Sequence, residues 1–197
     1  ILFGQAGFFF FFSDEEYPSF LRREYVYYKK LYELNQIESL EFKYAKLRPT
    51  SFPSIRLSQL AKIFERQDVF AHFVNGLSTK EMMQIFDVEA SEYWLDHSQI
   101  DKASKRIDGR IGTQTILGII INAVIPLLYS YGKQRGDDVL AEKVVEMLNT
   151  LKAEQNAVIK LYNDTFGKPK NASESQALIE LYTNYCSKKR CLNCSVF

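Results

Sequence analysis

The chain has 197 residues, of which 46% are hydrophobic, and its 25 basic and 24 acidic residues leave a net charge of +1. This apolar content excludes a disordered chain. The near-neutral charge excludes a global field that would steer the protein to nucleic acid or to an acidic membrane. The length fits one large or two small domains, and we expect a single helical domain over residues 1–197.

The longest apolar stretch, residues 116–128, is 13 residues long, whereas a bilayer-spanning helix needs about 20. Gly118, Asn122 and Pro126 also interrupt it. We therefore expect a buried core helix and no membrane association. The three cysteines are clustered, unlike those of a secreted disulfide framework, which favours a cytoplasmic protein.

Apolar periodicity and capping residues predict a series of short helices. They are expected at 17–34, 52–64, from Asp68 to just before Gly76, 78–86, 113–131, from Asp137 onward, 153–166 and 171–186. About seven or eight helices without repeats predict an irregular all-α domain rather than a four-helix bundle, ending in a short cysteine-containing tail.

Some side chains in this series have specific expected roles. Ser78 and Glu81 have the spacing of a capping box, and Asp137 and Asn171 are expected N-caps. Within the apolar helix, Pro126 is expected to introduce a kink, and Asn122 is expected to be a buried polar group that needs a partner. The polar segment 99–112 is expected to be an exposed loop or a subdomain seam.

The cysteines are the most chemically specific feature of the sequence. Cys186, Cys191 and Cys194 are the only three, in a C-x4-C-x2-C arrangement. This spacing is typical of a structural zinc site or of part of a [2Fe–2S] loop, both of which need a fourth ligand. His72, His97, a partner or a residue beyond Phe197 could supply it. The alternatives are three reduced thiols or a Cys191–Cys194 disulfide.

A second candidate site is the segment 47–56, where two prolines lead into a helix and Arg48 and Arg56 flank them. Guanidinium groups at a helix N-terminus can bind phosphate or carboxylate, and we count Gln59, one turn further on, with this candidate anion site. The ordinary alternative is that both arginines pair with acidic residues and hold the loop in place.

Further polar and aromatic candidates lie elsewhere. Trp94 and His97, with Tyr93 beside them, could form a ligand platform or half of an active site, although such residues more often belong to a core. Glu154 and Asn156 are candidate polar groups, although helix initiation explains Glu154 equally well. The sequence contains no Ser-His-Asp order, Walker loop or HExxH motif, so the catalytic residues stay unknown and the chain is not assigned to an enzyme class.

Seven segments together resemble the C-terminal part of a family of uncharacterised bacterial proteins, known only as a domain of unknown function. They are FGQAG (3–7), LRPTSFPSIRLSQLA (47–61), YWLDH (93–97), IIINAVIPLLYSYG (119–132), AEQN (153–156), SQALIELYTNYC (175–186) and CLNC (191–194). The resemblance implies that the chain is the C-terminal part of a protein about twice as long. A β-containing N-terminal region would then be its partner.

Three functions are consistent with these observations. The first is a helical binding or interaction domain, with a structural metal site at its C-terminus. The second is an accessory domain of a nucleic-acid-processing protein whose catalytic region is N-terminal, with Arg48, Arg56 and the basic segments 102–110 and 188–190 holding phosphates. The third is a purely structural domain with inert thiols. Near-neutral charge favours the first.

Overall fold

The computed structural model describes residues 1–9, 13–35, 42–66, 68–75, 78–194 and 196. The protein is 64% helical and 4% strand, which confirms the all-α prediction. The described part contains seven helices of seven residues or more, when Thr113–Arg135 is counted as one continuous helix. This number agrees with the seven or eight helices predicted from the sequence.

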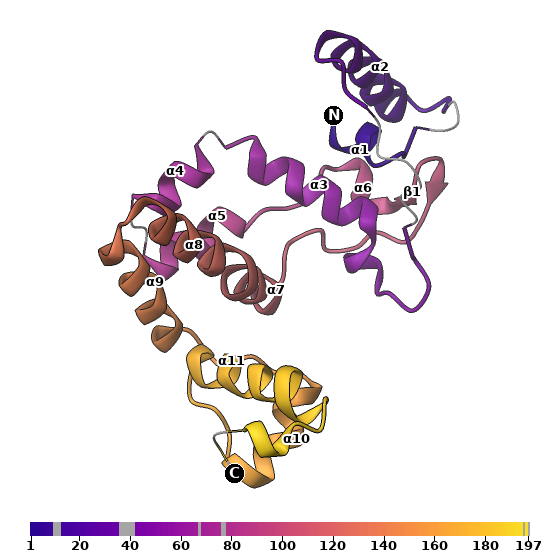
Figure 1. The fold of residues 1–197 in the computed structure, drawn as a ribbon. Coiled ribbons are helices and arrows are strands. Elements are labelled where there is room, and N and C mark those ends of the chain that lie inside the picture. Colours follow the sequence, from indigo (N-terminus) through magenta and orange to yellow (C-terminus); the bar gives the residue numbers. More distant parts are fainter. Residues whose placement is uncertain (10–12, 36–41, 67, 76–77, 195, 197) are drawn as a thin grey trace. The chain divides into compact units, whose positions relative to one another are not determined.

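The chain divides into two compact units, each described by itself below (Figure 1). Unit 1 comprises Ile1–Val69 and Ile85–Ile111, and unit 2 comprises Phe70–Gln84 and Gly112–Phe197. The chain passes from unit 1 to unit 2 after Ile111, inside the segment 99–112. The single domain over 1–197 and the seam at 99–112 stay predictions.

Unit 1 surrounds the side chain of Trp94. Its elements are α1 (Leu2–Gln5), α2 (Glu16–Leu31), the 3₁₀ turn η1 (Pro49–Ser51), α3 (Pro53–Phe64), α6 (Tyr93–Asp96), β1 (His97–Gln99) and β2 (Lys102–Ala103). Trp94 and Ile55 are 1% and 0% exposed, and Phe3, Ala90 and Leu95 form this core with them. Apolar residues from three separate sequence regions thus meet in one cluster.

The segment expected to be a loop at 99–112 contains a strand. β1 and β2 pair antiparallel, with His97 opposite Ala103, and Asp101 between them has a positive φ of 56°. The pair is too short and too polar to show the alternating pattern that indicates a strand. Further along, the carbonyl of Gly109 accepts a hydrogen bond from the backbone N–H of Ala90 at 3.0 Å, so the segment is tied into unit 1.

Unit 2 is built from helices. Its elements are α4 (Val69–Val74), α5 (Thr79–Phe86), α7 (Thr113–Ile119), the π-helical turn η2 (Ile120–Val124), α8 (Ile125–Arg135), α9 (Asp138–Thr150), α10 (Ala157–Phe166), α11 (Ala172–Leu181), the π-helical turn η3 (Tyr182–Cys186) and the 3₁₀ turn η4 (Cys191–Asn193). Figure 1 shows α8 and α9 side by side as an antiparallel pair. The first residue of α4 and the last two of α5 belong to unit 1.

The predicted caps are confirmed. Asp137 Oδ1 accepts from Leu140 N at 2.9 Å, and Asn171 Oδ1 accepts from Glu174 N at 3.0 Å. The Ser78–Glu81 capping box is complete, because Ser78 Oγ accepts from Glu81 N at 3.3 Å while Glu81 Oε2 accepts from Ser78 N at 2.8 Å. These caps satisfy backbone donors that a helix start leaves open.

Two predicted helix boundaries were wrong. α10 begins at Ala157, not Ala153, because Asn156 is its N-cap and accepts from Ile159 N at 3.0 Å. The apolar helix continues to Arg135 instead of ending near Tyr131, and Gly136 ends it with a φ of 70°. The short helix that follows Asp68 ends at Val74, and Gly76 lies outside the described residues.

Asn122 also differs from its prediction. It is exposed, not buried, and its Nδ2 donates to Gly118 O and to Glu154 Oε1, both at 3.0 Å. The expectation that it needs a partner is correct. Just beyond it, the helix passes through η2 immediately before α8, in which Pro126 occupies the first turn. A π-helical turn is a known way to accommodate an irregularity within a continuous helix.

The helix Thr113–Arg135, 23 residues long, is the one helix in the described part that could cross a membrane by length and composition. The core helix of a soluble protein meets the same criterion. Ile120, Val124 and Leu128 are each at most 5% exposed, and the helix packs against α9 within unit 2. These buried residues are part of the core of unit 2. The cytoplasmic localisation stays a prediction.

Candidate functional site

The guanidinium of Arg56 lies in the first turn of α3, in unit 1. Its Nη1 donates to Gln59 Oε1 at 2.9 Å, and its Nη2 lies 3.4 Å from Ser51 Oγ. Gln59 is 1% exposed, and its Nε2 donates to Gly109 O at 2.7 Å. The buried amide of Gln59 therefore holds Arg56 through its oxygen, while its nitrogen is hydrogen-bonded to the backbone carbonyl of Gly109.

The partners of Arg56 are neutral. No carboxylate forms an ion pair with it among the residues that the structure describes. The side chain is partly buried, and burial lowers the pKa of its guanidinium, which nevertheless stays charged. The expected alternative, in which an acidic residue pairs with Arg56, is not seen in the described part of the chain.

The start of α3 adds positive potential beside this group. Pro53 occupies the first turn, Phe52 is the N-cap and provides no side-chain hydrogen bond, and the first turn contains no acidic residue. The helix dipole thus places about half a positive charge at this end, without a capping oxygen to offset it. Arg48 is exposed at the start of η1, and no hydrogen bond joins it to Arg56 in the described residues.

Trp94 lies in the core of unit 1. Its ring stacks on Phe3 with centroids 4.8 Å apart and an interplanar angle of 1°. Its indole Nε1 is buried and has no hydrogen-bond partner in the described structure. Tyr93 contacts Trp94 edge to face, with centroids 5.0 Å apart, and stacks on His97 with centroids 4.1 Å apart.

His97 belongs to a separate cluster of titratable groups in unit 1. Its Nδ1 lies 2.6 Å from Asp96 Oδ1 and 3.0 Å from Tyr93 O, and its Nε2 lies 3.4 Å from Glu15 Oε1. Both ring nitrogens therefore face acceptors, an arrangement that suits the protonated imidazolium. Sequence reasoning did not find Glu15, which is 82 positions away from His97 and has no local pattern that indicates the contact.

Tyr93 connects the same groups. Its hydroxyl donates to Glu15 Oε2 and accepts from Asp101 N at 3.1 Å. Burial, followed by the hydrogen bond to Glu15, raises the pKa of Tyr93 well above its ordinary value. The hydroxyl therefore stays neutral. This cluster joins the N-terminal end of α2 to α6 and β1 through hydrogen bonds, a structural role within unit 1.

We expect His97 to make unit 1 more stable at mildly acidic than at alkaline pH. Burial lowers its pKa, but Asp96, Tyr93 O and Glu15 together raise it above the ordinary value of 6.5. A pKa that is raised on folding gives stability that is present below the unfolded value and is lost as the pH rises through the folded value. The urea concentration at the midpoint of unfolding should therefore decrease as the pH is raised from about 5.5 to about 8.5.

His97→Gln should remove most of this pH dependence, whereas His72→Gln, which changes an exposed histidine on α4, should keep it. The comparison isolates the imidazole of His97, because each variant replaces a single histidine with glutamine. Equal pH dependence in the wild type and in His97→Gln would contradict the role of the cluster.

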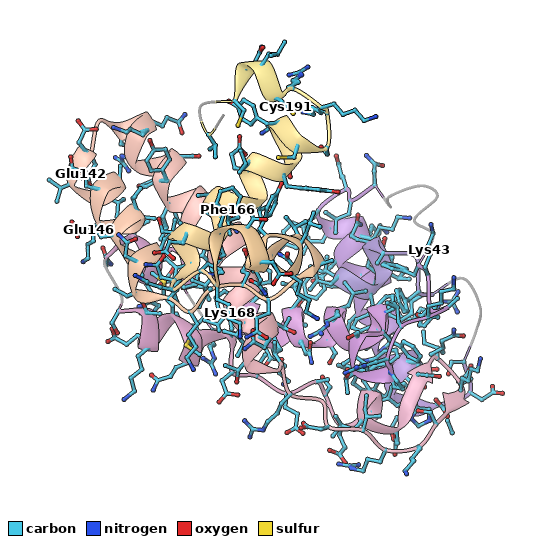
Figure 2. All side chains as sticks on the ribbon, turned by 90° about the horizontal axis from the view of Figure 1, so that it is seen from below. Lys43, Glu142, Glu146, Phe166, Lys168 and Cys191 are labelled. Atoms are coloured by element: carbon cyan, nitrogen blue, oxygen red, sulfur yellow. The ribbon has the colours of Figure 1, made fainter. Side chains whose placement is uncertain are left out.

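The three cysteines of unit 2 line one small cavity of about 130 Å³, together with Tyr162, Phe166 and Tyr185. Cys186 ends η3 and is exposed with Cys191, which is labelled in Figure 2, while Cys194 is buried. Burial and a hydrogen bond to Cys186 raise the pKa of Tyr162 to about 12. The short spacings have thus brought the thiols to one place.

Within the described residues, no three His, Cys, Asp or Glu side chains are positioned to hold a metal ion. His72 and His97, two of the candidates for a fourth ligand, do not line the cavity, and both ring nitrogens of His97 have partners. Zinc or an iron–sulfur cluster at Cys186, Cys191 and Cys194 stays a prediction, as do the reduced thiols and the disulfide.

The basic segment 102–110 is partly neutralised. Arg106 Nη1 lies 2.7 Å from Glu92 Oε1, and Arg110 Nη1 lies 3.2 Å from Asp87 Oδ1. Both pairs are exposed, and such pairs contribute little to stability. The guanidinium groups of Arg106 and Arg110 are nonetheless paired. Lys102 and Lys105 remain as exposed cations of this segment without an ion pair in the described structure.

These features define an all-α protein of two compact units. Its candidate site is an arginine at a helix N-terminus that has no carboxylate partner among the described residues. The family described as "Protein of unknown function (DUF2851)" matches residues 1–157, and the chain belongs to this family. The match includes Arg48, Arg56, Gln59, Trp94 and His97 and ends before the cysteines. No curated protein and no solved structure matches the chain.

Proposed function

We propose that the protein is a binding domain whose unit 1 holds an anionic group, a phosphate or a carboxylate, at Arg56. The observation that carries the proposal is the partly buried guanidinium with only neutral partners among the described residues. A charge removed from water without a counter-charge is costly, and an incoming anion would remove that cost.

The surroundings of Arg56 support this proposal. Gln59 fixes one nitrogen of the guanidinium, which reduces the side-chain entropy lost on binding. The uncapped start of α3 favours negative charge at the same end of the helix. Exposed Arg48 is the expected second contact, through its position on the loop that leads into α3. A planar guanidinium also suits bidentate binding of a carboxylate or phosphate.

Thermal-shift and calorimetric titrations with pyrophosphate and citrate at low ionic strength test the proposal. We expect either anion to raise the melting temperature of the wild-type protein. Arg56→Gln should weaken binding roughly tenfold or more, because it removes a charge-assisted hydrogen bond. Arg56→Lys should recover part of the affinity but not the bidentate geometry.

Arg110→Gln is the matched control, because Arg110 is exposed in the same unit and already pairs with Asp87. It should bind both anions as the wild type does. The proposal fails if neither anion stabilises the wild type, or if Arg56→Gln and Arg110→Gln behave alike. Salt-dependent heparin retention that follows Lys102 and Lys105 instead of Arg56 would favour the nucleic-acid alternative.

A further inference from the structure

The end of the last helix in unit 2 directs the cysteine segment back toward that helix. Tyr185 O accepts a hydrogen bond from Arg190 N at 3.0 Å, and Cys186 O accepts one from Lys189 N at 3.1 Å. Lys189 has a positive φ of 54°. This pair of hydrogen bonds with a left-handed residue is a Schellman motif, which ends a helix and redirects the chain. The turn η4 therefore contacts η3 and brings the other two cysteines to the cavity that Cys186 lines.

Cys191 and Cys194 lie at the two ends of one tight turn. The backbone N–H of Cys194 donates to the carbonyl oxygen of Cys191 at 3.1 Å, at the end of the 3₁₀ turn η4. The first and fourth Cα atoms of such a turn lie within about 7 Å of each other, and a disulfide requires Cα atoms about 4.4–6.8 Å apart. Both thiols are free and line the same cavity. The backbone thus holds them at a separation that is compatible with a disulfide.

The two thiols differ in their access to solvent. Cys191 is exposed, as its position on the C-terminal segment in Figure 2 shows, whereas Cys194 is buried. Thiol–disulfide exchange begins with a thiol that can reach the incoming disulfide, and a second thiol then attacks the mixed disulfide. Cys191 can therefore react first. Cys194 needs no contact with solvent for the second step, because its target is the sulfur of Cys191 in the same turn.

Cys186 has a different environment from the other two cysteines. It is the last residue of η3, and the hydroxyl of Tyr162 on α10 forms a hydrogen bond with it. Four residues, including those of the Schellman motif, separate it from Cys191. Because the tight turn joins only Cys191 and Cys194, we expect Cys186 to stay a thiol when the other two are oxidised.

The residues before Cys191 give this turn a positive charge. Lys188, Lys189 and Arg190 are exposed and form no ion pair in the described structure. Residues 181–197 contain no Asp or Glu. Three residues of chain span at most about 10 Å, which is about one Debye length at 0.1 M salt. The three charges therefore attract an approaching disulfide that carries carboxylates and repel a cationic one.

We propose that Cys191 and Cys194 form a reversible dithiol–disulfide site that exchanges with a low-molecular-weight disulfide carrying carboxylate groups, such as glutathione disulfide. The thiolate of Cys191 attacks one sulfur of this disulfide, whose S–S bond breaks, and one glutathione leaves as a thiolate that takes up a proton. The thiolate of Cys194 then attacks the sulfur of Cys191, and the second glutathione leaves in the same way. The dithiol is oxidised to a disulfide, and glutathione disulfide is reduced to two glutathione molecules.

Peptide mapping of the full chain by mass spectrometry tests the proposal. The reduced protein is incubated with glutathione disulfide, and the remaining thiols are then alkylated. We expect a disulfide between Cys191 and Cys194 and an alkylated Cys186, and dithiothreitol should restore all three thiols. No reaction, a disulfide that includes Cys186, or zinc that is bound to the freshly purified chain and protects the thiols would overturn the proposal, whatever happens at Arg56.

The salt dependence of the rate tests the preference for an acidic disulfide. Between about 10 mM and 1 M salt, we expect the rate of thiol loss with glutathione disulfide to fall roughly threefold or more, because the attraction is screened. The rate with cystamine, a cationic disulfide, should rise over the same range. The same salt dependence for both disulfides would contradict this preference.

Two variants assign the roles of the thiols. Cys194→Ser should accumulate the mixed disulfide between Cys191 and glutathione roughly tenfold above its level in the wild type, because no neighbouring thiol releases the glutathione. Cys191→Ser should leave the buried Cys194 unmodified. Cys186→Ser is the matched control and should form the disulfide at the wild-type rate. Equal amounts of mixed disulfide in the wild type and in Cys194→Ser would overturn the proposal.

Discussion

Trp94→Ala is expected to lower the free energy of unfolding of unit 1 by about 3–5 kcal/mol, the usual cost of truncating a buried large aromatic residue. Trp94 is 1% exposed and stacks on Phe3, and Phe8 and Tyr17 meet its edges. Its removal leaves a cavity between elements that are distant in sequence. Such a loss is a large part of the stability of a typical domain.

Urea denaturation followed by far-UV circular dichroism measures this effect, because the variant lacks the only tryptophan of the chain. Phe64→Ala is the control, since Phe64 is 66% exposed on α3 and its truncation should cost within about 0.5 kcal/mol. Trp94→Phe should cost less than Trp94→Ala, because it keeps most of the ring volume and removes the unpaired Nε1. Similar losses in Trp94→Ala and Phe64→Ala would contradict the core assigned to unit 1.

Gly132→Val is expected to destabilise unit 2 by about 1–3 kcal/mol, the range of overpacking in a close contact. A Cβ atom on Gly132 would lie 3.0 Å from Asp137 O and 3.2 Å from Ala141 N. These are backbone atoms at the start of α9, so they cannot rotate away as a side chain can. Gly132 therefore allows α8 and α9 to approach closely, and it does not end the helix.

Gly118→Val is the matched comparison, because it makes the same change in the same continuous helix. An added Cβ there meets no atom of the described structure within 4 Å. Valine and glycine differ by only a few tenths of a kcal/mol in helix propensity, so the variant should stay within about 0.5 kcal/mol of the wild type. Equal destabilisation by both substitutions would show that helix propensity, not the α8–α9 contact, decides the effect.

In the candidate sites, contacts within one helix could be predicted from the sequence, whereas contacts between distant residues could not. The association of Arg56 with Gln59 could be anticipated, since residues three apart lie on one face of a helix. The neutral environment of Arg56 could not, because it depends on what the fold brings near. His97 with Glu15, and Glu154 with Asn122 and Gln176, are pairings across long stretches of chain, and no local pattern predicts them.

Glycine and asparagine illustrate the same limit. In the sequence, Gly132 follows the predicted end of the helix at residue 131. In the structure the helix continues through Gly132, where α9 packs closely against α8. Only the packing of α8 and α9 shows why a glycine is needed there. Asn122 was predicted to be buried because its neighbours in the sequence are apolar. In the structure it is exposed and contacts Glu154 in the connection after α9. Both errors come from judging the environment of a residue by its sequence neighbours.

By itself the sequence determined the all-α class, most helix positions and the caps at Ser78, Asp137 and Asn171, since periodicity and capping act within one or two turns of chain. The tertiary structure decided which groups meet, because those contacts join residues tens of positions apart and depend on packing. It placed Trp94 in a core, left Arg56 with neutral partners in the described part of unit 1, and set Tyr162 beside the three cysteines around one cavity in unit 2.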